Sequence, residues 1–315
     1  MKSNFEYPDD LKDEFERAKK IEQFSIVFLI FTAWVMYVTM GNSQAMKTEW
    51  VDDILSLMPP ISFLIASAIY TRGRNDQFPY GYHRVVSIAY LCSAFSLFIV
   101  GGFVFTDALL KLIKAEHPTI GTMVVFGIPI WQGYIMILAL IVTNIPIVIL
   151  GRMKLPLARK LHEKNLHTDA QMNKADWMTA LAVIFGIIGI GAGLWWADAV
   201  AAIAISFDIL YDGFKNLKQA VFDLMNQVPK DPEHTKNDPL LKKISEVLGR
   251  EEWIKEFSLR IREEGHVYFG EAFVVPRTEQ RILQNIRKTK AKVSLLSWLI
   301  YDFNLIPVDR IETNQ

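Results

Sequence analysis

The chain has 315 residues, 51% of them hydrophobic, and a formal net charge of zero. Its mean hydropathy of +0.19 and its apolar share exceed those of most soluble domains. A balanced charge gives no reason to expect nucleic acid as a partner. The single cysteine, Cys92, excludes a disulfide within the chain and a cysteine-rich metal site. The composition therefore predicts a membrane protein.

Residues 1–23 are mostly charged or polar, and we expect them to form a cytoplasmic N-terminal segment without a cleavable signal. Leu11, Phe15 and Ala18 follow helical spacing among the charges. This spacing predicts a short amphipathic helix at the inner membrane surface, with a solvated tail as the alternative.

Six apolar stretches approach the roughly 20 residues that a membrane-spanning helix needs. They are Phe24–Gly41, Val51–Tyr70, Val85–Ile113, Trp131–Leu150, Trp177–Leu194 and Trp196–Leu210. They predict an all-α transmembrane domain of six helices over residues 24–225. The second stretch carries Pro59-Pro60, which removes two backbone donors and predicts a kink.

Basic residues between the apolar stretches predict the orientation. They gather after the second stretch (Arg72, Arg74, Arg84) and after the fourth (Arg152, Lys154, Arg159, Lys160, Lys164). Cytoplasmic loops of membrane proteins carry such an excess of Lys and Arg. We therefore expect both termini in the cytoplasm.

The C-terminal part has the pattern of a small soluble α+β domain. Residues 226–239 are polar and rich in proline, as in a linker, residues 240–309 form the predicted domain, and residues 310–315 form a tail. The predicted elements are a helix over Leu240–Leu248, strands over Ile254–Arg262 and His266–Val275 around a Glu263-Glu264-Gly265 turn, a helix over Thr278–Trp298, and a strand over Ile300–Ile306.

Ionisable groups inside a membrane are costly, so each is a candidate for function. They are Asp52, Asp53, Asp169, Lys174, Asp176, Asp208 and Asp212. Asp176 lies deepest and is the strongest candidate. We expect Asp169 to be solvated near the start of its helix, with a ligand as the alternative, and we hypothesise that Lys174 pairs with a buried carboxylate such as Asp208. Asp52 and Asp53 are either ligands or residues of the outer interface.

Spacing arranges polar side chains in two stripes. Asp169, Met172, Asn173 and Asp176 share one helix face, Asp52 and Ser56 share another, and Asp53 lies one position round. Facing each other, the stripes could hold one divalent ion, and their carboxylates could exchange it for protons. Straight helices would place Asp52 near the outer face and Asp176 near the inner one, so contact requires a tilt or kink. Ser56, one turn deeper, narrows that gap.

Three motifs connect the chain with a known family. They are Phe78-Pro-Tyr-Gly-Tyr-His-Arg84, Phe105-Thr-Asp-Ala-Leu-Leu-Lys111 and the tight Leu194-Trp-Trp-Ala-Asp198 turn. With them, nearly the whole chain resembles the cation diffusion facilitators. The resemblance implies a homodimer in the lipid bilayer of a bacterial inner membrane, with a ferredoxin-like cytoplasmic domain. It implies export of divalent metal ions in exchange for protons by rocking of helices.

The family's transport site uses two residues, four apart, from each of the second and fifth helices. Here these positions match Asp52 and Ser56, and Met172 and Asp176, with Asp53 and Asn173 as neighbours that could substitute. The usual histidine is absent from this set. The transported ion could be manganese, iron, cobalt, nickel or zinc, with the case for zinc weakened. We expect no permanently bound cofactor.

Other metal sites of the family lack their ligands in this sequence. The matching positions are Asn75, Phe78 and Tyr82 before the third span, and Phe257, Phe273, Asn304 and Ile306 in the C-terminal domain. We therefore expect no two-metal cluster there. We also expect His162, His167 and His234 to be solvated, whereas His83 lies closest to a membrane role.

Two other functions compete with metal–proton exchange. A membrane-embedded enzyme is disfavoured because neither Gly-x-Ser-x-Gly nor His-Glu-x-x-His occurs in the sequence. A divergent family member could move another cation or act as a scaffold that transports nothing, because the site is altered.

Overall fold

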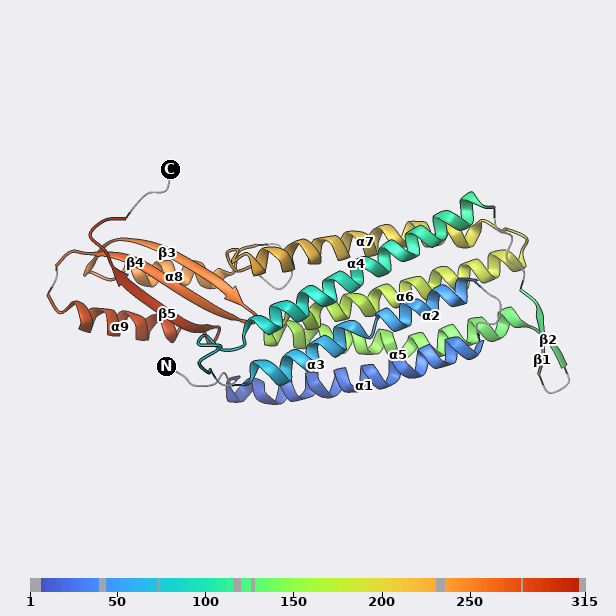
Figure 1. The fold of residues 1–315 in the computed structure, drawn as a ribbon, viewed down its shortest axis with the longest axis horizontal. Coiled ribbons are helices and arrows are strands. Elements are labelled where there is room, and N and C mark those ends of the chain that lie inside the picture. Colours follow the sequence, from blue (N-terminus) through green and yellow to red (C-terminus); the bar gives the residue numbers. More distant parts are fainter. Residues whose placement is uncertain are drawn as a thin grey trace.

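A helical part and a smaller α+β part follow each other along the chain (Figure 1). The computed structural model describes residues 7–39, 44–72, 74–115, 120–125, 128–230, 236–278 and 280–311. The long helices run side by side, and the α+β part lies at the end of the bundle where α1 (Asp9–Thr39) begins. The predicted fold class is confirmed.

Within the described residues, five helical stretches are long and apolar enough to cross a membrane. They are α1, residues Trp50–Tyr70 across α2 (Gln44–Leu55) and α3 (Met58–Tyr70), α4 (Arg84–Ile113), α5 (Gln132–Leu161) and α6 (Lys164–Gly191). The sixth predicted span lies in α7 (Ala197–Leu224), which is longer than predicted. α7 runs alongside α4 in the bundle.

Glycines allow α4 and α7 to approach closely. A Cβ atom on Gly213 would lie 2.7 Å from the Phe98 Cα atom, and one on Gly101 would lie 2.8 Å from the Leu210 backbone nitrogen. Real Cβ atoms do not come so near, so the two backbones touch only because both positions lack a side chain.

Residues 9–23, before the first apolar stretch, are part of α1 and not a separate surface helix. The helix runs unbroken from Asp9, and Phe15 and Ala18 are buried in a cluster with Phe63 and Leu157. The predicted helix is therefore confirmed, whereas its separate position at the surface and the alternative of a solvated tail are wrong. The apolar residues at helical spacing face neighbouring helices of the same chain.

A short hairpin, not predicted from the sequence, lies at the end of the bundle opposite the C-terminal domain. Its strands, β1 (Thr122–Val125) and β2 (Ile128–Trp131), pair antiparallel. Trp131, expected to begin the fourth span, ends β2, and α5 starts one residue later.

The C-terminal domain has the element order α8 (Pro239–Gly249), β3 (Ile254–Glu264), β4 (Val267–Pro276), α9 (Ile282–Ser294) and β5 (Ile300–Pro307). β4 is the central strand, antiparallel to β3 and parallel to β5. Apolar residues of α8, α9 and the sheet form one buried cluster. α9 is shorter than the predicted Thr278–Trp298. β3 continues through Glu264, so the turn falls one to two residues later than predicted.

The tip of the β3–β4 hairpin docks on the start of α4. Gly265 has φ +71°, and its backbone N–H donates to Ser87 Oγ at 3.0 Å. A Cβ atom on Gly265 would lie 2.5 Å from the His83 carbonyl oxygen. This position therefore requires glycine for its backbone conformation and for the close contact.

Candidate functional site

The second span is interrupted beside the candidate site. α2 ends at Leu55 and α3 begins at Met58, with the two prolines in its first turn. Pro59 has no N–H to offer the Leu55 carbonyl, and Ser96 Oγ on α4 donates to that oxygen instead at 2.9 Å. The interruption predicted from Pro59-Pro60 is confirmed, and a neighbouring helix replaces a lost hydrogen bond.

The interruption brings Ser56 to Asp176. Ser56 Oγ donates to Asp176 Oδ1 at 2.6 Å, and both side chains are buried. The two stripes predicted from sequence therefore face each other across α2 and α6. Ser56 lies just past the end of α2, where the chain leaves the helix. Its contact with Asp176 shows that the end of α2 and this part of α6 lie at the same depth in the bundle.

Asp52 and Asp53 are both buried but face different helices. Asp52 lies beside Thr179 of α6 and Asp53 beside Thr32 of α1. Only 3% of Asp52 and 5% of Asp53 is exposed, so the interpretation of either residue as solvated at the outer interface is wrong. Asp52 shares its α6 neighbourhood with Asp176.

The remaining candidates on α6 are buried in different surroundings. Met172 packs with Leu97, Val100 and Ile209, in an apolar cluster of α4, α6 and α7. Asn173 faces α5, where the absent side chain of Gly151 leaves room for its Cβ atom. Plain packing accounts for the position of Met172, whereas Asn173 brings an amide into the interior.

Several buried polar atoms at the site have no hydrogen-bond partner within the described residues. They are Asp52 Oδ1, Asp53 Oδ2, Asp176 Oδ2 and Asn173 Nδ2. Buried carboxylate oxygens normally have a partner. The described part of the chain contains no group of three or more His, Cys, Asp or Glu placed to hold a metal ion. A cation bound here would thus need Ser56, Asn173 or water in addition to carboxylates.

Asp169 is not solvated, which corrects the expectation from sequence. It is fully buried, and its Oδ2 atom lies 2.6 Å from Lys154 Nζ on α5. The same ammonium lies 3.2 Å from Glu22 Oε2 on α1. Lys154, counted among the basic residues of a loop, lies instead inside a helix and is fully buried.

Lys174 pairs with Asp208, as hypothesised from the sequence, but the expected burial of this pair is wrong. Lys174 Nζ lies 2.7 Å from Asp208 Oδ2 and 3.6 Å from Asp212 Oδ2. The side chains of Lys174 and Asp208 are 46% and 48% exposed in the single chain. The pair therefore lies on the outer surface of α6 and α7 and not in the interior.

Several histidines lie where the bundle meets the C-terminal domain. His162, expected to be solvated, is buried, and its Nε2 atom lies 2.9 Å from the Tyr268 hydroxyl. His83 packs against Tyr301 and His266. Burial and the nearby Arg74 lower the pKa of His83 to about 4, so this ring is neutral at physiological pH. His234 lies outside the described residues.

Lys164 connects the two parts of the protein. Its Nζ atom lies 2.8 Å from Asp223 Oδ2 on α7 and 2.8 Å from Glu263 Oε2 on β3. All three side chains are buried. Like Lys154, this residue was expected in a loop.

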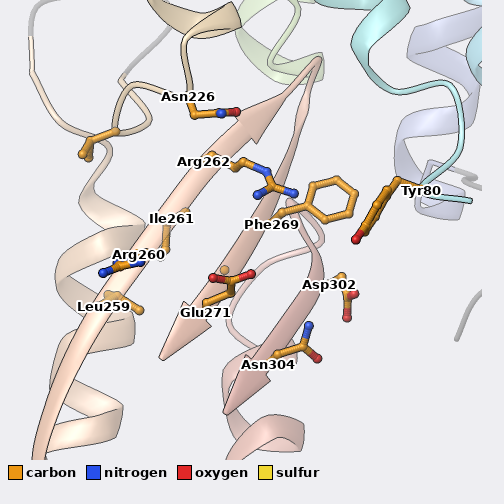
Figure 2. Close-up of a pocket in the computed structure, with 12 residues that line it drawn as sticks. Tyr80, Asn226, Leu259, Arg260, Ile261, Arg262, Phe269, Glu271, Asp302 and Asn304 are labelled. Carbon is orange, nitrogen blue, oxygen red and sulfur yellow. The ribbon is translucent and has the colours of Figure 1, made fainter. Parts of the chain in front are cut away.

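The C-terminal sheet has a polar face with a hollow of about 530 Å³ in front of it (Figure 2). Cross-strand pairs on this face join Arg260 with Glu271 and Arg262 with Phe269. Their neighbours on β5 are Asn304 and Asp302. Of the family positions noted above, Asn304 alone lines this hollow, and Tyr80 from the segment before α4 closes one side.

Residues 23–225 match the family described as the cation efflux transmembrane domain. This match covers more than half of the chain and agrees with the helical bundle and its buried carboxylates. The chain therefore belongs to the cation efflux family, the cation diffusion facilitators. It is an integral membrane protein and a metal cation transporter.

Two similar proteins come from Bacillus subtilis (strain 168). The manganese efflux system protein MneS is 23% identical over 219 residues, covering 67% of this chain and 71% of MneS. The manganese efflux system protein MneP is 21% identical over 259 residues, covering 79% of this chain and 80% of MneP.

Proposed function

We propose that this protein exports divalent metal ions from the cytoplasm in exchange for protons, with manganese as the first substrate to test. The observation that carries the proposal is the contact between Ser56 and Asp176 at the helix interruption, beside buried carboxylate oxygens without a partner. The names of the two Bacillus relatives favour manganese.

The proposed transport site is built from oxygen donors. Asp52 and Asp176 provide carboxylates from α2 and α6, and Ser56 and Asn173 provide neutral polar groups. Such donors suit Mn²⁺, which prefers carboxylate, carbonyl and water oxygens, and the absence of imidazole disfavours zinc. Asp53 and Met172 remain further candidate ligands, Asp53 through a rotation toward α6 and Met172 through its thioether.

Exchange for protons follows from the chemistry of buried carboxylates. A carboxylate must lose its proton before it binds a metal ion, and a buried, ionised carboxylate without a counter-ion is costly. The site would therefore hold either protons or a divalent ion. Rocking of α1, α2, α3, α5 and α6 against α4 and α7 would expose it alternately to the two sides of the membrane.

The proposed setting is a homodimer in a bacterial inner membrane with both termini in the cytoplasm. In this arrangement residues 24–225 form the transmembrane domain and residues 240–309 the cytoplasmic domain. Packing of the C-terminal domains would contribute to the dimer, because their sequence lacks the family's metal ligands.

Transport by purified protein in proteoliposomes tests the proposal. Vesicles with an imposed pH gradient receive Mn²⁺, Fe²⁺, Co²⁺, Ni²⁺, Zn²⁺ or Cd²⁺, and metal and proton fluxes are recorded together. We expect Mn²⁺ flux coupled to opposite proton flux, and its loss in Asp176→Asn. Asp107→Asn is the matched control, because Asp107 and Lys111 form an ion pair within α4 and neither belongs to the proposed transport site.

Two outcomes would contradict the proposal. Absence of flux for every metal in well-folded wild-type protein would favour a scaffold or a carrier of another cation. Equal flux in Asp176→Asn and Asp107→Asn would place the transport site elsewhere.

A further inference from the structure

A buried triad of ionisable side chains lies near the proposed transport site and shares helix α6 with it. Lys154 Nζ on α5 lies between Asp169 Oδ2 at 2.6 Å and Glu22 Oε2 at 3.2 Å. All three side chains are fully buried, and each comes from a different helix. No part of the proposed transport site uses them.

The triad contains two acids and one base. If both acids were ionised, the group would carry a net negative charge without access to water. Such a charge is expensive inside a protein in a membrane, and protonation of one acid removes it. Asp169 is the nearer partner of Lys154, and neither Glu22 oxygen has a hydrogen-bond partner within the described residues. Of the two acids, Glu22 is therefore the one whose ionised form is less stabilised by its surroundings.

The triad has an electrostatic connection to the transport site. Asp169 precedes Asp176 by seven residues, which is two turns of α6, or about 10 Å on the same helix face. Two charges at such a distance interact more strongly in the protein interior than in water. Lys154 joins Asp169 to Glu22, so a change of charge at the transport site reaches Glu22 through Asp169 and Lys154.

We propose that Glu22 is a second proton-binding site, and that it releases its proton when a divalent cation binds between Asp52 and Asp176. The positive charge of the bound metal ion favours the ionised form of Glu22, because it compensates the negative charge that the triad gains when Glu22 loses its proton. Asp169 lies between Asp176 and the end of the bundle that carries the C-terminal domain. The released proton leaves from Glu22 to water at that end, while Lys154 stays charged. This inference rests on the proposed function.

A purely structural role for the triad gives a different expectation. An ion triad that only joins α1, α5 and α6 would affect stability when changed, but not the number of protons exchanged. The number of protons released per bound ion therefore separates the two roles.

Proton release is measured by titrating the purified full-length protein with Mn²⁺ in buffers of different ionisation enthalpy. We expect Glu22→Gln to bind Mn²⁺ but to release about one proton fewer than wild type, and the slope of log Kd against pH to fall by about one. Glu16→Gln on the same helix is the matched control, because Glu16 is exposed and pairs with Lys19. It should release as many protons as wild type.

Asp169→Asn provides an independent variant. Lys154 then pairs with an ionised Glu22, and the number of released protons should again fall by about one. Unchanged proton release in both Glu22→Gln and Asp169→Asn would overturn the proposal. Failure of Glu22→Gln to fold would do the same, since Gln reproduces the shape and charge of a protonated Glu. If wild type binds no divalent metal ion at all, the proposed function fails first.

Discussion

Replacing Lys164 by Met should loosen the attachment of the C-terminal domain. The change leaves Asp223 and Glu263, each 2.8 Å from the ammonium, buried without their shared cation. Removing one partner of a buried ion pair costs about 3–5 kcal/mol. Burial already raises the pKa of Glu263 to about 7, so this acid can take up a proton when the cation is lost. We therefore expect Lys164→Met to lower the free energy of unfolding by about 3 kcal/mol, the low end of this range.

Thermal unfolding of the purified protein in detergent measures this effect. A loss of about 3 kcal/mol corresponds to a decrease in Tm of roughly 6–12 °C. Lys292→Met is the matched control, because Lys292 pairs with Glu251 at 2.7 Å but is 61% exposed. An exposed pair contributes at most about 1 kcal/mol, so the control should unfold close to the wild type.

A second substitution tests the cause of the destabilisation. Adding Glu263→Gln to Lys164→Met removes one of the two buried acids that have lost their cation. The other acid, Asp223, keeps its hydrogen bond from Gln219 at 2.6 Å. The double variant should therefore recover part of the lost Tm. The reasoning is refuted if Lys164→Met unfolds together with Lys292→Met, or if Glu263→Gln brings no recovery.

Three further predictions concern the hairpin tip, the site and the pH dependence. Gly265→Ala should cost about 2 kcal/mol or more in unfolding experiments, because its φ is +71° and the new Cβ atom would meet the His83 carbonyl. Ser56→Ala should reduce Mn²⁺ flux in proteoliposomes less than Asp176→Asn does, because it removes one neutral donor and keeps the carboxylate. Wild-type stability should fall as the pH rises from about 4.5 to about 7, because the folded pKa of Glu263 lies above its unfolded value and the folded state binds the extra proton.

Each of these predictions has a contradicting result. A wild-type Tm for Gly265→Ala would show that the hairpin tip does not dock as described. Complete loss of flux in Ser56→Ala would make the hydroxyl as important as the carboxylate. The stability change between pH 4.5 and 7 should become smaller in Glu263→Gln, and an unchanged pH profile would assign that dependence to other groups.

The sequence predicted the elements whose signals are local. Apolar runs located the membrane helices, alternation located β3 and β4, and Pro59-Pro60 located the interruption of the second span. Helical spacing placed Ser56 and Asp176 on the polar faces of two different spans. Their contact follows if these two faces meet. These predictions depended on periodicity and on the missing N–H groups of proline, both of which can be read within a few residues.

The buried charges were missed because their partners are distant in sequence. Lys154 occurs among basic residues that are typical of a cytoplasmic loop, and its partners lie 15 residues ahead and 132 residues behind. For the same reason Asp169 was expected to be solvated. The available signal was weak: Glu22 lies two residues before the apolar run that starts at Phe24.

Two serine hydroxyls make α4 a spacer of defined length. Ser87 accepts from the tip of the C-terminal hairpin, and Ser96 donates to the carbonyl at the end of α2. Nine residues separate them, about 14 Å of continuous helix. Inserting one residue between them would rotate one hydroxyl by about 100° relative to the other, so both contacts could not form together. The length of this stretch of α4 therefore fixes the height of the helix interruption relative to the C-terminal domain.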